Sequence, residues 1–91
     1  MSYEIILSPA AKKDILTLRK TSDVAVMKKL NKLLDELREH PTVGTGKPER
    51  LKHNLAGCWS RRITQEHRLV YRIEEDIVTV IVIRAHGHYT E

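Results

Sequence analysis

The sequence predicts an α+β fold in which a two-helix hairpin packs on one face of an antiparallel sheet. Apolar residues recur at helical spacing in the first half of the chain and alternate with polar residues in the second half. The segment 42–48, TVGTGKP, separates the two halves as a loop. Residues 3–7, YEIIL, read as a short strand, so the order is strand, two helices and a strand meander, typical of a two-layer α+β domain.

Two helices are predicted in the first half. Ser8 followed by Pro9 is a typical helix start, because the hydroxyl caps the first turn and proline has no backbone donor to lose there. The first helix is predicted over residues 9–20, and residues 21–23 break it and offer a second cap. The second helix ends before Pro41, which cannot continue it. Its apolar residues at helical spacing are Val26, Met27, Leu30, Leu33, Leu34 and Leu37.

Three strands are predicted in the second half, where the apolar residues alternate. They cover residues 58–64 (CWSRRIT), 67–73 (HRLVYRI) and 76–83 (DIVTVIVI). The polar residues at 64–66 and 74–76 suit two hairpin turns. Because the last strand is apolar on both faces, it is expected in a central, covered position of the sheet.

Size and composition limit the class of protein. Ninety-one residues suit a single domain spanning 1–91, with a modest core. No run is long and apolar enough to span a membrane, and the first residues lack the basic-then-apolar pattern of a signal peptide. The one cysteine, Cys58, cannot form an internal disulfide, so a reducing cytoplasm is the expected location.

No cofactor is expected. The chain has no GxxxxGK[ST], GxGxxG or GxSxG pattern, so nucleotide-cofactor and serine-hydrolase chemistry has no support. Five histidines are many for this length, and His86 and His88 have the spacing to share a face, with a third ligand from His53 or His67. Without a second cysteine or an HExxH pattern, no functional metal is expected either.

Positive charge is concentrated in one segment. The formal net charge is +4, and residues 46–72 hold seven of the sixteen Lys and Arg residues but only two acids. The other residues carry nine bases and ten acids, a net charge of −1. A segment of this kind attracts a polyanion, with nucleic acid as the first candidate. The alternative is a solvated basic surface without a ligand.

The arginines of this segment are expected on the sheet face that the helices leave open. Arg68 shares a strand face with Arg72, and Arg62 shares one with Ser60. A three-residue turn at 64–66 would place Arg62 opposite Arg68, whereas a two-residue turn would not. Two facing cations destabilise a sheet unless an anion binds between them. The sequence leaves this register open.

The residue types are those needed to cleave RNA without a metal. The ribose 2′-OH attacks the adjacent phosphate, and the reaction needs a base, cations around the phosphoryl oxygens, and an acid for the leaving 5′-oxygen. Glu49 is the only acid in the loop that leads into the basic strands. Cations on or near the same segment are Lys52, Arg62 and Arg68, and His88 and Tyr89 follow the last strand.

Each of these residues also has a simpler interpretation. Glu49 reads equally as a solvated loop acid, and His88 as a surface residue. Trp59 and Tyr71 favour the core over a base-stacking role. Residue types alone therefore give only a weak indication of a ribonuclease.

A longer motif is much more specific. The stretch GKPERLKHNLAGCWSRRITQEHRLVYRI, followed after the last predicted strand by GHY, closely resembles the YoeB (Txe) family of toxins in the RelE/ParE superfamily. The resemblance follows the element order throughout and is strong over residues 44–89. It implies a RelE/ParE-like fold and a ribosome-dependent endonuclease that cuts mRNA in the ribosomal A site. The alternatives are a ParE-like gyrase inhibitor, or an RNA- or ribosome-binding module on the same scaffold.

The resemblance also implies roles for single residues. Glu49 matches the family's general base, Arg68 its phosphate-stabilising arginine and His88 its general acid, with Tyr89 the neighbouring aromatic. Residues expected to support RNA binding or the transition state are Lys52, Arg62, Tyr89, Lys47 and Arg61. The implied partners are a YefM-like antitoxin, the ribosome with its small-subunit rRNA, the mRNA substrate and a second copy of the chain.

The chain departs from the family pattern in two places. Cys58 stands where an aromatic residue is common, which is expected to alter packing beside Trp59 more than chemistry. Thr90 and Glu91 follow the usual H-Y ending, and a carboxylate close to His88 would favour the protonated imidazole that a general acid needs.

Overall fold

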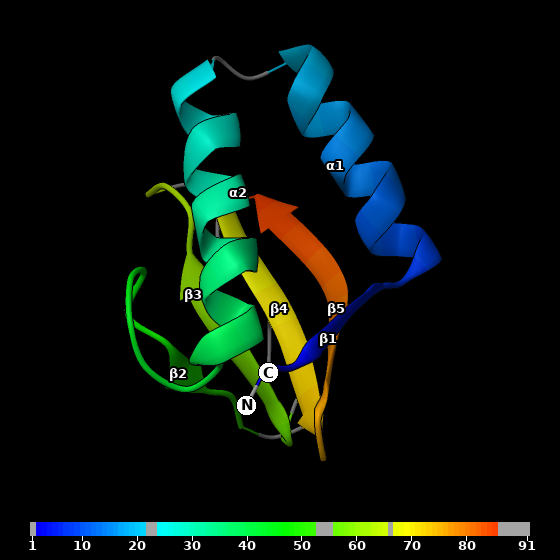
Figure 1. The fold of residues 1–91 in the computed structure, drawn as a ribbon. Coiled ribbons are helices and arrows are strands. Elements are labelled where there is room, and N and C mark those ends of the chain that lie inside the picture. Colours follow the sequence, from blue (N-terminus) through cyan, green and yellow to red (C-terminus); the bar gives the residue numbers. More distant parts are fainter. Residues whose placement is uncertain (1, 22–23, 53–55, 66, 86–91) are drawn as a thin grey trace.

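The computed structural model describes residues 2–21, 24–52, 56–65 and 67–85. The helices are α1 (Pro9–Thr21) and α2 (Val24–Glu39), and the strands are β1 (Glu4–Leu7), β2 (Glu49–Arg50), β3 (Cys58–Arg62), β4 (His67–Glu74) and β5 (Ile77–Ala85). Both helices lie on the same side of the sheet (Figure 1). The predicted α+β architecture is confirmed, since a helix pair covers one face of the sheet and leaves the other face open.

The strands lie in the order β1-β5-β4-β3-β2. Neighbours from β5 to β2 are antiparallel, as expected, but β1 pairs with β5 in parallel. The internal position predicted for the last strand is confirmed, because β5 lies between β1 and β4. Strand β2 was not predicted: Glu49 was assigned to the loop, yet it pairs with Ser60 at the edge of the sheet.

The start of α1 is tied to β5. The Ala11 amide donates to the Ser8 Oγ at 3.0 Å, which confirms the predicted cap. The same hydroxyl donates to the Ile81 carbonyl oxygen at 2.5 Å. One turn further along, Asp14 Oδ2 accepts the Ile83 amide at 3.0 Å, beyond the end of β1. Helix α1 therefore completes the hydrogen bonds of β5 where β1 stops.

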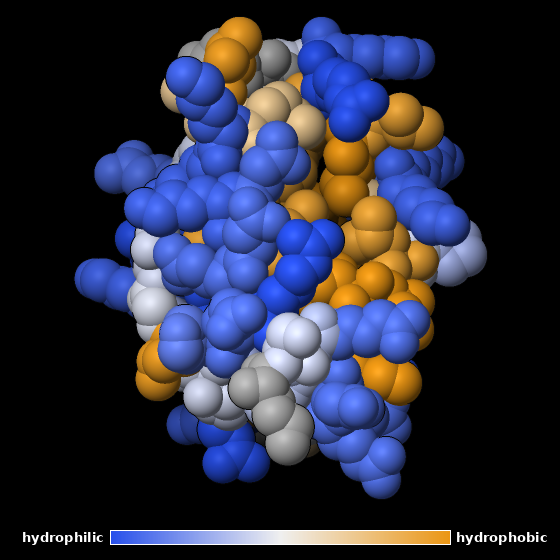
Figure 2. Space-filling model, in the orientation of Figure 1, coloured by the Kyte–Doolittle hydropathy of each residue, from blue (hydrophilic) through white to orange (hydrophobic). Residues whose placement is uncertain are grey.

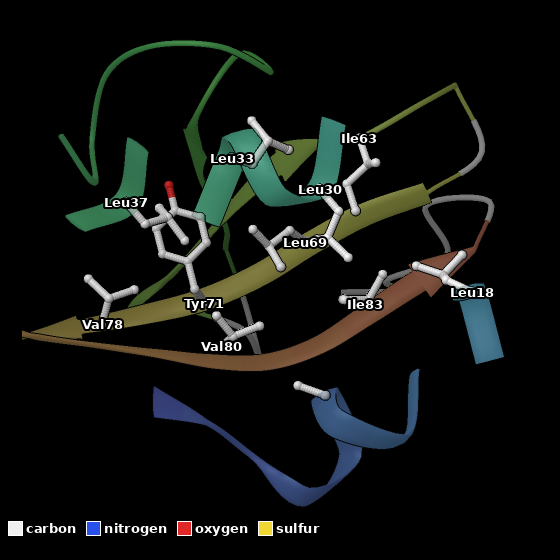
Figure 3. Close-up of a cluster of buried hydrophobic side chains, with 11 residues drawn as sticks. Leu18, Leu30, Leu33, Leu37, Ile63, Leu69, Tyr71, Val78, Val80 and Ile83 are labelled. Atoms are coloured by element: carbon white, nitrogen blue, oxygen red, sulfur yellow. The ribbon is translucent and has the colours of Figure 1, made fainter. Parts of the chain in front are cut away.

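The main core lies between the helices and the sheet. Leu30, Leu33 and Leu37 of α2 lie over side chains of β4 and β5, including Leu69 and Tyr71 (Figure 3). Burying each such leucine contributes about 1.5–3 kcal/mol to folding. Seen from the helix side, Figure 2 shows hydrophilic residues over α2 and hydrophobic residues between the two helices.

Trp59 and Tyr71 occupy the core side of the sheet, as the sequence predicted. Tyr71 is fully buried, and Trp59 packs against the main core cluster. The guanidinium of Arg50 lies 5.9 Å from the centroid of the Trp59 ring, and the two residues pair across β2 and β3. A cation over an aromatic face is mildly stabilising, so this contact helps to hold the short strand β2.

Candidate active site

The open face of the sheet carries the candidate site. Paired residues of neighbouring strands share a face, and in β3 and β4 the pairs on this face are Cys58 with Arg72, Ser60 with Val70, and Arg62 with Arg68. Glu49 of β2 pairs with Ser60 and therefore belongs to the same face. The predicted grouping of Arg62 with Ser60, and of Arg68 with Arg72, is confirmed.

The hairpin between β3 and β4 places two arginines opposite each other. The Ile63 amide donates to the His67 carbonyl oxygen at 2.9 Å, so three residues form the turn, and Arg62 pairs with Arg68. The Thr64 Oγ accepts the His67 amide at 3.1 Å and steadies the turn. Of the two registers that the sequence left open, the structure has the one that brings these cations together.

A carboxylate compensates for this repulsion. Arg68 Nη1 donates to Glu49 Oε1 at 2.9 Å, although β3 lies between their two strands. Neighbouring strands are about 4.8 Å apart, so the two side chains span roughly two strand spacings to meet. The Glu49 side chain is 59% exposed and that of Arg68 23% exposed. The pair is open to solvent on the carboxylate side, where a substrate would approach.

A third arginine belongs to the same row by register. Arg84 of β5 pairs with Arg68, which itself pairs with Arg62, so three adjacent strands each place an arginine at one level of the sheet. Sequence reasoning missed Arg84, although the antiparallel pairing of the two last strands would have suggested it. Of these, Arg62 and Arg68 are the described cations of the open face, and two facing cations favour an anion between them.

An unpaired hydroxyl lies in the floor of this face. Ser60 is 1% exposed, and its Oγ has no hydrogen-bond partner among the residues that the structure describes. Its strand neighbours are Glu49 on one side and Val70 on the other. The rest of the floor is a small apolar cluster made of Leu51, Cys58 and Val70, with Ile81 and Val82 against it.

The remaining predicted site residues lie at different places. Lys47 and Lys52 are exposed and flank β2, on the two sides of Glu49. His88 and Tyr89 lie outside the described residues, so the structure does not place the expected general acid. Within the described part of the chain, no group of three His, Cys, Asp or Glu residues could hold a metal ion.

Arg61 does not lie where RNA contact requires. Its side chain is fully buried on the helix side of the sheet, because Arg61 and Arg62 are consecutive in β3 and alternate between faces. Nη1 donates to Glu36 Oε1 at 2.9 Å, and Nε donates to the Tyr71 hydroxyl at 3.2 Å. The expectation that Arg61 binds RNA is therefore wrong for this structure.

The buried guanidinium instead holds the loop that leads to β2. It donates to the carbonyl oxygens of His40, Val43 and Thr45. Tyr71 extends this network, since its hydroxyl donates to the Pro41 carbonyl oxygen at 2.6 Å. Four carbonyl oxygens of this segment, at residues 40, 41, 43 and 45, find partners here, so the segment entering β2 is held against the core.

Two ionisable groups of this network have shifted pKa values. The Thr45 hydroxyl, which donates to the Glu36 carboxylate at 2.7 Å, holds the pKa of that carboxyl below its usual value against the opposing effect of burial, and Arg61 lowers it further. Burial raises the pKa of the Tyr71 hydroxyl, an effect that nearby Arg61 opposes. The Glu36 carboxylate therefore stays ionised beside the buried guanidinium.

The fold and this basic face place the chain in the RelE/ParE-like class of bacterial toxins. It superimposes on a YoeB/ParE toxin from Agrobacterium tumefaciens with a TM-score of 0.81 and 38% identity, over 91% of this chain and 98% of that one. A family model described as the YoeB-like toxin of bacterial type II toxin–antitoxin systems matches residues 8–89. The chain belongs to the YoeB toxin family of type II toxin–antitoxin systems.

Individual relatives agree with this assignment. The chain is 51% identical to toxin YoeB of Escherichia coli K12 over 65 residues, which cover 71% of this chain and 77% of that protein. The YoeB dimer from Staphylococcus aureus has a TM-score of 0.79 and 38% identity, covering 94% of this chain and 99% of that one. A YoeB–YefM complex from the same organism has a TM-score of 0.79 and 36% identity at the same coverage. No helix in the described ranges combines the length and apolarity that crossing a bilayer takes.

Proposed function

We propose that the protein is a ribosome-dependent endoribonuclease, which cuts mRNA in the A site without a metal and so stops translation. The observation that carries this proposal is the contact between Glu49 and Arg68 on an open face whose surroundings are basic. A carboxylate beside a guanidinium supplies a proton acceptor and a phosphate partner at one place. Membership of a toxin family agrees with a protein that acts on an essential cellular process.

In this mechanism Glu49 removes the proton from the ribose 2′-OH, whose oxygen attacks the adjacent phosphorus. Arg68, with support from Arg62, stabilises the charge that develops on the phosphoryl oxygens. His88 donates a proton to the 5′-oxygen as its bond to phosphorus breaks, and Tyr89 lies next to it in the chain. The products are a 2′,3′-cyclic phosphate and a free 5′-hydroxyl, so no water enters this step and no cofactor is needed.

The resting ion pair gives a physical reason for the proposed dependence on the ribosome. Glu49 and Arg68 neutralise each other at 2.9 Å, so each is occupied before the substrate arrives. A scissile phosphate that takes the place of the carboxylate on Arg68 releases Glu49 for proton transfer. The ribosome would supply the orientation of the mRNA that makes this exchange productive. The flanking Lys47 and Lys52 would hold neighbouring phosphates of mRNA or rRNA.

The test is primer extension on a message translated in an extract, with and without the protein. Glu49→Gln, Arg68→Ala and His88→Ala are each expected to lower cutting by about 100-fold or more. Arg38→Ala and Asp35→Asn are matched controls, because this exposed ion pair lies on α2, on the other side of the sheet, with its closest atoms 2.7 Å apart. Undiminished cutting by all three site variants would end the proposal. Intact mRNA with broken DNA in intoxicated cells would indicate a gyrase inhibitor instead.

We also propose a YefM-like antitoxin as the neutralising partner and the cytoplasm as the place of action. The solved YoeB–YefM complex and YoeB dimer of S. aureus support an antitoxin and a homodimer for this chain. An acidic segment that folds on binding would suit the basic open face. Protection of Arg62 and Arg68 from arginine-modifying reagents by the antitoxin is expected. Equal reactivity of both residues in the complex would contradict this placement.

A further inference from the structure

A basic pocket lies beside the end of β3, apart from the contact between Glu49 and Arg68. It has a volume of about 330 Å³. Three elements distant in sequence form it, namely α2, the loop before β2 and the turn after β3. Besides Ile63, its lining residues are Lys29, Gly46, Lys47, Arg62, Thr64 and Gln65.

Close backbone contacts build this pocket. The Arg62 amide donates to the Gly46 carbonyl oxygen at 2.7 Å, which fixes the loop against β3. Gly46 has a φ of +85°, and a Cβ there would come within 2.7 Å of the Arg62 carbonyl oxygen, so only glycine fits. Lys47 follows with a φ of 51°, in the left-handed region. Lys29 reaches across from α2, and its Nζ donates to the Ile63 carbonyl oxygen at 3.3 Å.

The charge of the pocket is one-sided. Its lining includes three cations, Lys29, Lys47 and Arg62, and no acid among the residues that the structure describes there. Three cationic residues around one pocket raise the electrostatic potential there, so an anion that enters it is stabilised. Thr64 and Gln65 add polar side chains that suit the oxygens of a phosphate.

We propose that this pocket binds a phosphate group of the RNA strand, one that neighbours the scissile phosphate. Arg62 connects the two places, since it lines the pocket and pairs directly with Arg68 on β4. Neighbouring strands are about 4.8 Å apart, so a chain with one phosphate at Arg68 has further phosphates within reach of the pocket. A polynucleotide supplies negative charges in a regular row, which one carboxylate does not. This inference rests on the proposed function, because it takes single-stranded RNA as the substrate.

The experiment measures binding rather than cleavage. The affinity of a short single-stranded RNA is followed by fluorescence anisotropy at several salt concentrations, for the wild type, Lys29→Gln and Lys47→Gln. Each variant is expected to bind about tenfold more weakly, with the slope of log K against log salt reduced by about 0.7. Two oligonucleotides of unrelated sequence are expected to lose affinity equally, because a phosphate contact reads no bases.

Lys28→Gln is the matched control. It removes the same charge from the residue of α2 that precedes Lys29, and Lys28 does not line this pocket. If Lys28→Gln changes affinity and slope as much as Lys29→Gln, the effect is general charge and the pocket proposal fails. A hexaglutamate peptide is titrated in parallel with the RNA. The proposal also fails if the pocket variants bind this peptide more weakly but bind RNA as the wild type does, because the occupant would then be an acidic protein segment. A loss of RNA binding in the pocket variants alone would support it, whether or not cleavage by Glu49 and Arg68 is observed. Lys47→Gln keeps the test decisive if Lys29→Gln does not fold.

Discussion

Glu49 and Arg68 meet across an intervening strand, with 2.9 Å between Oε1 and Nη1. This contact joins the edge of the sheet to its middle strand and brings together residues that are nineteen positions apart. It also means that the proposed base and the proposed phosphate ligand occupy each other in the resting protein. In the proposed mechanism, substrate binding is an exchange of anions on Arg68.

Glu49→Gln is expected to separate RNA binding from RNA cleavage. Removing the carboxylate takes one competing anion away from Arg68, so the affinity for single-stranded RNA rises several-fold, while cutting of translated mRNA falls by about 100-fold or more. Anisotropy titration measures the first quantity and primer extension the second. Glu74→Gln, which removes an equal charge from the exposed pair with Arg72, is the control for net charge. Weaker RNA binding by Glu49→Gln than by Glu74→Gln would contradict the exchange.

Arg61 and Arg62 are expected to differ sharply in their contribution to stability. Arg61→Ala leaves the Glu36 carboxylate without its buried partner and the loop carbonyl oxygens without donors, at a cost of about 3–5 kcal/mol. Arg62→Ala removes an exposed cation that faces Arg68, and changes the free energy of unfolding by no more than about 0.5 kcal/mol. Urea denaturation of both variants measures the difference. Equal changes in the free energy of unfolding for the two variants would contradict the burial of Arg61.

Acid is expected to weaken the network around Glu36. The pKa of this carboxyl is lower in the folded protein than its usual value of 4.5, so its contribution is fully present above that value and is lost as the pH falls through the lower, folded-state pKa. Glu36→Gln should therefore lower stability at about pH 7 and flatten the loss of stability between about pH 5 and pH 3. Urea titrations at these pH values check this. Asp35→Asn, an exposed neighbour paired with Arg38, should keep the wild-type slope.

Ser60→Ala is expected to leave the fold at least as stable as the wild type. The buried Oγ lacks a hydrogen-bond partner among the described residues, and an unsatisfied buried hydroxyl costs about 1–3 kcal/mol. Thermal unfolding of the variant, with Thr64→Ala as a control that loses the hydrogen bond from the His67 amide, measures this. A strong destabilisation by Ser60→Ala would mean that the hydroxyl has a structural role that its contacts do not reveal.

Much of the fold could be predicted from local patterns. The Ser8 cap, the helical spacing of α2, the alternation in β3 and β4 and the apolar run of β5 each depend on neighbouring residues, and all these elements are observed. Strand β2 could not be predicted in this way, because its two residues, Glu49 and Arg50, are too short to show a period. Parallel pairing of β1 with β5 depends on residues more than seventy positions apart, which no local pattern specifies.

The site, like the fold, could be predicted from the sequence only in part. The hairpin register that pairs Arg62 with Arg68 depends on turn length, and the sequence allowed two lengths. The burial of Arg61, in contrast, had a signal: in an alternating strand it shares a face with Trp59 and Ile63, both on the core side. The alternation of faces along β3 was therefore a better guide to Arg61 than its grouping with the RNA-binding residues. The contact between Glu49 and Arg68 could not be predicted, because it depends on how strands β2, β3 and β4 lie in space.

The pairing of β1 with β5 has a consequence for how the protein folds during its synthesis. Residues 4–7 emerge early during synthesis, but their hydrogen-bonding partners, residues 77–80, emerge last among the strands. Contacts between such distant segments form only after the intervening chain is available. The sheet therefore closes after most of the polypeptide has left the exit tunnel. A chain that is still being synthesised therefore lacks the complete sheet until its last strand is available.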